Sequence, residues 1–124
     1  MSATGKTPPG KTYDPEDRTL QFARDVRAFL RSVPRTVANI EDGKQLIRAS
    51  GSVGANYIEA NEALSKKDFR LRAKISRKEA KESRYWLRLL DVGRDPRAGE
   101  QRQKLVVEAT ELMNIFGAIL RKTE

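Results

Sequence analysis

The chain has 124 residues, 38% of them hydrophobic, which suits one domain with a single small core. Its formal net charge of +8 favours an acidic partner, and the absence of Cys excludes disulfides, thiolate nucleophiles and Cys-ligated zinc. No apolar run reaches the roughly 18 residues of a membrane span, and no charged-then-apolar leader is present. We therefore expect a cytoplasmic, bacterial-type protein with no membrane partner.

The first residues, MSATGKTPPGKT, are small, polar and rich in Pro and Gly, so 1–13 is expected to be a disordered tail. A helix is predicted over about 15–33, because Asp14 can cap it, Pro15 suits its first position and Pro34 stops it. Its apolar residues fall on two adjacent faces, which can pack against different helices. One face carries Leu20, Ala23, Arg27 and Leu30, and the other carries Phe22, Val26, Phe29 and Val33.

Residues 36–43 are ambiguous, and we expect a connection with partial helicity in which Gly43 is a kink or a break. A second helix is predicted over about 44–63 from its apolar periodicity. Its middle, ASGSVGA at 49–55, is poor in bulk. That composition lowers helix propensity but lets another helix backbone approach closely.

The third predicted helix, about 66–92, carries most of the charge, with ten Lys or Arg and four acids between residues 65 and 92. At about 100° per residue, six of the cations fall within one arc of roughly 80° and form a single basic stripe. They are Arg70, Lys74, Arg77, Lys81, Arg84 and Arg88. Roughly opposite lies an apolar face that we expect the rest of the chain to cover. It consists of Phe69, Leu71, Ile75, Trp86, Leu87, Leu89 and Leu90, and Ser76, Glu79, Glu82 and Ser83 fall inside the same arc.

A turn-rich connection at 93–99 separates this helix from a fourth, predicted over about 100–122. Four amphipathic helices with short connections pack most simply as an all-α, antiparallel, up-down-up-down four-helix bundle spanning 14–124. The two-faced first helix and the wide apolar arc of the third leave more apolar surface than an isolated bundle needs. Homo-oligomerisation is the expected way to cover it.

The basic stripe predicts binding to nucleic acid, because a helix beside a phosphate backbone can present several cations in register and release condensed counterions. The alternative is an ordinary solvated face, in which the cations often form ion pairs with acids one turn away. The acids of this helix lie elsewhere on the wheel, which favours binding. Few aromatic side chains are placed to stack on bases, since only Tyr85 borders the stripe and Trp86 points to the core side.

Several polar groups fall on faces that should be buried, where an unpaired charge would cost about 3 to 5 kcal/mol. They are Arg48, Asn56, Glu59, Glu79 and Glu82. We interpret them as a structural polar network between helices or subunits. The competing interpretation is a carboxylate-bridged di-metal centre, which in bundles uses Glu-x-x-His, and the chain has no His. No metal, cofactor or catalytic residue is predicted, since phosphate loops and nucleophile elbows are also absent.

Two segments, LIRASGSVGANYIEANEA at 46–63 and DFRLRAKISRKEAKESRYWLRLL at 68–90, resemble the four-helix-bundle family of 23S rRNA intervening-sequence proteins. The C-terminal EATELMNIFGAILRK also fits, so the resemblance covers about 18–122. Its signature combines Arg-x-Ser and Asn-x-x-Glu-Ala with Glu-Ala-x-Glu-Ser. The matching positions are Arg48, Ser50, Ser52, Asn56, Glu59, Glu79 and Glu82.

This resemblance implies an up-down bundle, commonly a ring-shaped homopentamer without known catalytic activity, with some members suspected of binding RNA. A related branch, the accessory variability proteins of diversity-generating retroelements, engages a reverse transcriptase and nucleic acid. We therefore expect a non-enzymatic, oligomeric bundle that binds nucleic acid, RNA in the first place, through its basic stripe. The alternative is a protein-interaction scaffold, or an accessory subunit that docks a nucleic-acid-processing partner such as a reverse transcriptase.

Overall fold

The computed structural model describes residues 14–124, which form four helices and, over that range, no strand. The prediction for the tail at 1–13 lies outside the described residues. The helices are α1 (Pro15–Leu30), α2 (Val37–Asn61), α3 (Lys66–Leu89) and α4 (Pro96–Lys122). The prediction of an all-α chain with four helices is confirmed.

Each helix begins at a side-chain cap of the kind that satisfies a free backbone N–H. Asp14 accepts from the amide of Glu16 at 2.8 Å, as the sequence predicts for α1. Ser65 accepts from the amide of Asp68 at 3.0 Å and begins α3. These caps depend on neighbouring residues only, which is why sequence reasoning located both helix starts.

The predicted start of the second helix at residue 44 is wrong, because α2 already begins at Val37. Thr36 caps it by accepting from the amide of Asn39 at 3.1 Å. The Asn39 amide group in turn donates to the carbonyl oxygens of Pro34 and Asp91, at 2.9 and 2.8 Å. This first turn is therefore held by a loop that is remote in sequence, and no local pattern encodes that contact.

The other helix ends differ by smaller amounts from those predicted. Helix α1 ends at Leu30 rather than 33, and α3 at Leu89 rather than 92. Helix α4 begins at Pro96 rather than 100, since Asp95 caps it and Pro occupies its first turn. The glycine-rich composition of 93–99 obscured this start.

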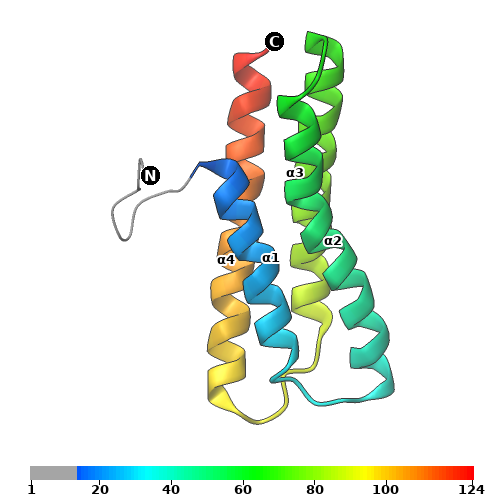
Figure 1. The fold of residues 1–124 in the computed structure, drawn as a ribbon. Helices are drawn as coiled ribbons and strands as arrows, with labels where there is room; N and C mark the ends of the chain where they lie inside the picture. Colours follow the sequence, from blue (N-terminus) through cyan, green and yellow to red (C-terminus); the bar gives the residue numbers. More distant parts are fainter. Residues whose placement is uncertain (1–13) are drawn as a thin grey trace.

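The four helix axes are roughly aligned, and consecutive helices are neighbours (Figure 1). The colours run downward in α1 and α3 and upward in α2 and α4 (Figure 1). One core fills the space between them, and each fully buried Leu or Phe adds about 1.5 to 3 kcal/mol of hydrophobic stabilisation. Its largest members are Phe22, Val26, Phe29, Leu46, Val53, Leu87, Leu90, Leu112 and Phe116.

The buried face of α3 agrees with the predicted arc only in part. It consists mainly of small residues, Ala73, Ser76, Ala80 and Ser83, followed by Leu87. Leu71 and Leu89, predicted to be covered, are 53% and 51% exposed. The physical reason is close packing against α2, since the Ser76 hydroxyl donates to the carbonyl of Val53 at 2.9 Å and leaves no room for large side chains.

Candidate nucleic-acid interface

The six cations predicted to bind nucleic acid lie along the side of α3 that borders α4, and we call them the basic face. Its members are Arg70, Lys74, Arg77, Lys81, Arg84 and Arg88. From the first to the last they span about 27 Å of helix axis. Lys74, Arg77, Lys81 and Arg88 are exposed, whereas Arg70 and Arg84 are half-buried. The line therefore contains two kinds of cation.

Arg70 is bonded to the end of the neighbouring helix. Its Nη1 donates to the carbonyl of Leu120 at 2.6 Å and to the hydroxyl of Thr123 at 2.7 Å. A cation at a helix C-terminus also interacts favourably with the helix dipole. Arg102, near the start of α4, makes the reciprocal bond, because its Nη1 donates to the carbonyl of Leu90 at 2.6 Å, just past the end of α3.

Arg84 is attached to α4 halfway along the bundle. Its Nη1 donates to the hydroxyl of Thr110 at 3.1 Å, and that hydroxyl donates to the carbonyl of Val106 one turn earlier. Arg70 and Arg84 thus orient the basic face against α4, and the four exposed cations project beyond it.

No carboxylate within the described range 14–124 forms an ion pair with any member of the basic face. The nearby acids of α3 and α4 have other partners. Glu79 and Glu82 of α3 pair with Lys78, with N–O distances of 3.6 and 3.3 Å. Glu108 and Glu111 of α4 face α1. The positive charge of the basic face is therefore not neutralised within this part of the chain.

The five residues predicted to form a polar network do not come together in one cluster. Asn56 accepts from Arg72 at 3.2 Å and donates to the carbonyl of Ser52 at 2.9 Å. Glu79 and Glu82 share Lys78, as described above. Arg48 and Glu59 are exposed on α2 and form no ion pair with other described residues. The structure instead has two ion pairs that share Lys78 on α3, and a separate contact between Asn56 of α2 and Arg72 of α3.

Sequence reasoning missed the main buried ion cluster, which joins α1 to α4. Arg18 donates to both oxygens of Glu108, at 2.7 and 2.8 Å, and also to Glu111. These hydrogen bonds raise the pKa of the Arg18 guanidinium above its usual value. The only local signal is an Arg on the otherwise apolar side of the first helix, because its partners lie in the last one.

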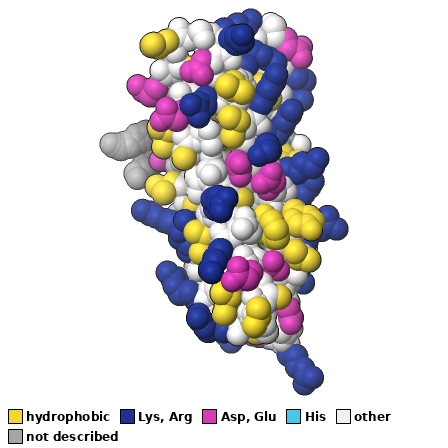
Figure 2. Space-filling model, turned by 90° about the vertical axis from the view of Figure 1, so that its right-hand side faces the viewer, with side chains coloured by type: hydrophobic (Ala, Val, Ile, Leu, Met, Phe, Trp, Pro, Cys, Tyr) yellow, Lys and Arg dark blue, Asp and Glu magenta, His cyan; other side chains and the backbone are white. Residues whose placement is uncertain are grey.

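Next to the basic face, α3 carries a second line of residues with the same spacing, which we call the outer stripe. Its members are Leu71, Ile75, Lys78, Glu82, Tyr85 and Leu89. The Tyr85 ring is exposed and packs edge-on against Trp86, with centroids 5.0 Å apart. Figure 2 shows the side of the molecule that includes α2 and α3, where hydrophobic side chains gather between Asp, Glu, Lys and Arg.

Two further findings concern metal binding and membrane-spanning helices. In the range 14–124, no group of three or more Asp and Glu side chains is placed to hold a metal ion. None of the four described helices is long and apolar enough to cross a membrane.

Comparison with known proteins agrees with the sequence resemblance. The model of the family described as 23S rRNA-intervening sequence protein matches residues 14–117. A solved structure from Bacteroides thetaiotaomicron, described as a protein with unknown function from the S23 ribosomal protein family, is 30% identical. The alignment covers 85% of this chain and 96% of that one, with a TM-score of 0.73. None of the curated proteins compared with the chain matches it.

Proposed function

This chain belongs to the 23S rRNA-intervening sequence protein family, and we propose that it is a non-enzymatic protein that binds the backbone of nucleic acid, RNA in the first place. The observation that carries the proposal is the basic face, six cations in line on α3 without a carboxylate partner among residues 14–124. Neither the family description nor that of the solved relative names a reaction.

The proposed mechanism is electrostatic. Each phosphate neutralised by Lys or Arg releases condensed counterions, so binding weakens as salt is added and depends little on base sequence. Lys74, Arg77, Lys81 and Arg88 would make the contacts, because their side chains are exposed. Arg70 and Arg84 would add to the positive electrostatic potential of the basic face and hold it in position against α4.

We further propose that the antiparallel bundles assemble into a ring-shaped homo-oligomer through the outer stripe. Leu71, Tyr85 and Leu89 are each more than half exposed there, while Lys78 and Glu82 supply both signs of charge. Such a stripe, with a 3.5-residue spacing, suits packing against another helix. Assembly would multiply the basic faces and add avidity to weak individual contacts. Leu89→Glu is expected to reduce the mass in sedimentation to that of one 14.0 kDa chain.

The test is binding of the purified protein to generic single- and double-stranded RNA and DNA across a salt series. We expect the logarithm of affinity to fall linearly with the logarithm of salt, with a slope of several units, at roughly 0.7 to 0.9 per contacted phosphate. A slope near zero, or no binding at low salt, would refute the proposal. It would favour the alternative of a scaffold that docks a nucleic-acid-processing protein such as a reverse transcriptase.

A triple variant locates the binding surface. Lys74→Glu, Arg77→Glu and Lys81→Glu together should lower RNA affinity at least a hundredfold and reduce the salt slope by about 2 to 3 units. These side chains make no hydrogen bond within residues 14–124, so helix content and melting temperature should stay unchanged. The matched control changes net charge equally on the opposite side of the bundle: Arg24→Glu, Arg27→Glu and Arg35→Glu. It should keep RNA affinity within a few fold.

A further inference from the structure

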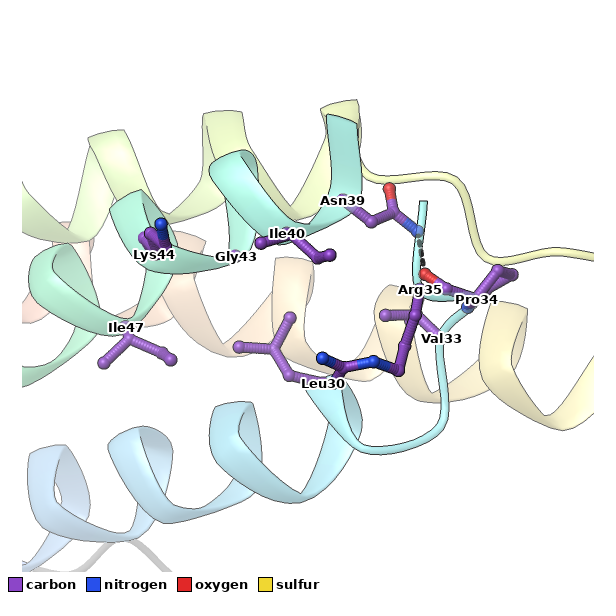
Figure 3. Close-up of a pocket in the computed structure, with 9 residues that line it drawn as sticks. All are labelled: Leu30, Val33, Pro34, Arg35, Asn39, Ile40, Gly43, Lys44 and Ile47. Atoms are coloured by element: carbon purple, nitrogen blue, oxygen red, sulfur yellow. Dashed lines mark hydrogen bonds between the residues drawn. The ribbon is translucent and has the colours of Figure 1, made fainter. Parts of the chain in front are cut away.

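The seam between α1 and α2 is hollow along its length, on a different side from the basic face. One hollow of about 350 Å³ lies between the first three turns of α1 and the second half of α2. A second, of about 190 Å³, continues the seam toward the loop between the two helices. In Figure 3, Leu30 of α1 and Ile47 of α2 point into this second hollow. We call the two hollows together the α1–α2 groove.

The groove exists because α2 lacks side-chain bulk where it faces α1. Gly51, Gly54 and Ala55 occupy successive positions along the first hollow, opposite Ala23 of α1. A Cβ on Gly54 would lie 2.7 Å from the hydroxyl oxygen of Thr19, so at this point the two helices are in contact. A Cβ on Gly51 would meet only the Arg27 guanidinium, at 3.7 Å. The helices thus touch at Gly54 and leave a trough above Gly51.

The floor of the groove is apolar and open. Leu20 is 51% exposed and Ile58 48%, and Ile40 and Ile47 continue the line at the other end. On α1 the groove follows the predicted face that carries Leu20, Ala23, Arg27 and Leu30, and Ile40, Ile47 and Ile58 are its apolar neighbours on α2. No element within the described range packs over them, so the groove is an unpartnered apolar surface.

The rim is cationic. Arg24 and Arg27 line the first hollow, and Arg35 and Lys44 line the second, while Glu16 is the one acid among the lining residues of both. Glu16 accepts from Asn61 at 2.7 Å and closes one end. Arg24, Arg27 and Arg35 form no ion pair with any residue of 14–124. In Figure 3 the Arg35 side chain extends beside Leu30, so that charge and apolar floor are adjacent.

We propose that the α1–α2 groove binds an acidic amphipathic helix of a partner protein. Helix α1 has 16 residues, so the groove runs for about 24 Å and takes roughly four turns of a helix. Apolar side chains at i, i+3, i+4 and i+7 would lie on the floor, as in other helix-in-groove complexes. Carboxylates on both flanks would reach the rim cations. The proposal does not depend on nucleic-acid binding.

Charge complementarity favours this occupant over three others. A second copy would present its outer stripe on α3, in the segment 65–92 that has ten Lys or Arg and four acids, and would bring cations to a cationic rim. Residues 1–13 contain Lys6 and Lys11 and no acid, so the same repulsion applies to that segment. An RNA backbone would match the rim but would leave the apolar floor without a partner.

The probe is a designed, fluorescein-labelled helical peptide of about 16 residues with Leu and Ala on one stripe and Glu elsewhere, titrated with the full chain in fluorescence anisotropy. A peptide of the same composition in shuffled order keeps the charge and loses the stripe. We expect the amphipathic peptide to bind at least tenfold more tightly than the shuffled one. Equal affinities, or no binding of either, would overturn the proposal.

Two variants then locate the site. The triple Arg24→Glu, Arg27→Glu and Arg35→Glu should weaken peptide binding at least tenfold, and Leu20→Ser with Ile58→Ser should do the same without changing charge. The basic-face triple, which changes charge equally, should leave it within about twofold. Loss of peptide binding only in the basic-face triple would overturn the proposal. A changed sedimentation mass in the groove variants would also overturn it, because the groove would then be an interface between copies. A hundredfold loss of RNA affinity in the groove variants would overturn it as well, because the groove would then be a nucleic-acid surface.

Discussion

The basic face of α3 and the α1–α2 groove carry the same kind of charge and differ in what lies between the charges. Along α3, the cations stand beside one another and are oriented by bonds to α4. In the groove, the cations flank an apolar trough in which Leu20 and Ile58 are half exposed. A row of charge alone suits a phosphate backbone, whereas charge beside an open apolar floor suits a folded peptide. Net charge alone cannot distinguish the two.

The two surfaces also differ in how firmly their helices are held, and Arg18 tests this difference. Helix α1 is attached to α4 by the bonds of Arg18 to Glu108 and Glu111. Arg18→Met keeps an unbranched apolar stem but removes the guanidinium, which leaves Glu108, 27% exposed, without its partner. We expect the free energy of unfolding to fall by about 1.5 to 3 kcal/mol, measured by urea denaturation.

The control for this prediction is Arg24→Met on the same helix. Arg24 is exposed and forms no ion pair with the described residues, so its replacement should change stability by less than about 0.5 kcal/mol. Equal effects of the two variants would mean that α1 is held by its apolar face alone.

The glycines of α2 test whether the groove is a trough with one point of contact. Gly54→Ala should lower the free energy of unfolding by about 1 to 2 kcal/mol, because the new Cβ would press on the buried, hydrogen-bonded side chain of Thr19. Gly51→Ala should raise it by about 0.5 to 1 kcal/mol, since the methyl group fits and Ala favours the helix. Thermal unfolding of the pair checks both signs. Destabilisation by both would show that the helices are in contact at Gly51 as well.

A single pair of alanine variants separates the two kinds of cation on the basic face. Arg84→Ala should lower the free energy of unfolding by about 0.5 to 1.5 kcal/mol, because Thr110 loses its hydrogen-bond donor. Lys81→Ala should leave stability unchanged and lower the salt slope of RNA binding by about 0.7 to 0.9. The reverse assignment, with stability lost in Lys81→Ala, would contradict the division into structural and exposed cations.

Sequence periodicity predicted the four helices well, because caps and apolar spacing are local. Asp14 and Ser65 each satisfy an amide two or three residues away, and both helix starts were predicted closely. The start of α2 was missed although the Thr36 cap is equally local, because Gly43 was expected to be a kink or a break and α2 instead runs through it. The buried face of α3 was predicted only in part: Ser76 and Ser83 fall inside the predicted arc and are buried, but large apolar residues were weighted above Ala73 and Ala80, which allow the close approach of α2.

For the candidate site, the sequence located the line of cations but could not tell its members apart. Arg70 and Arg77 share one helical face and one residue type, yet the first is bonded to the backbone of α4 and the second is exposed. That difference depends on where α4 ends. The groove was visible only as surplus apolar surface, because its shape depends on which small residues of α2 face α1.

The reciprocal bonds of Arg70 and Arg102 constrain how the two helices can change in length. Arg70 reaches Leu120 in the last turn of α4, and Arg102 reaches Leu90 just beyond the end of α3. A one-residue insertion inside either helix would shift its end by about 1.5 Å and turn it by about 100°, so a guanidinium would no longer meet its carbonyl. Related chains that keep both arginines are therefore expected to place insertions in the connection between Leu90 and Asp95, and to vary α3 and α4 in length only together.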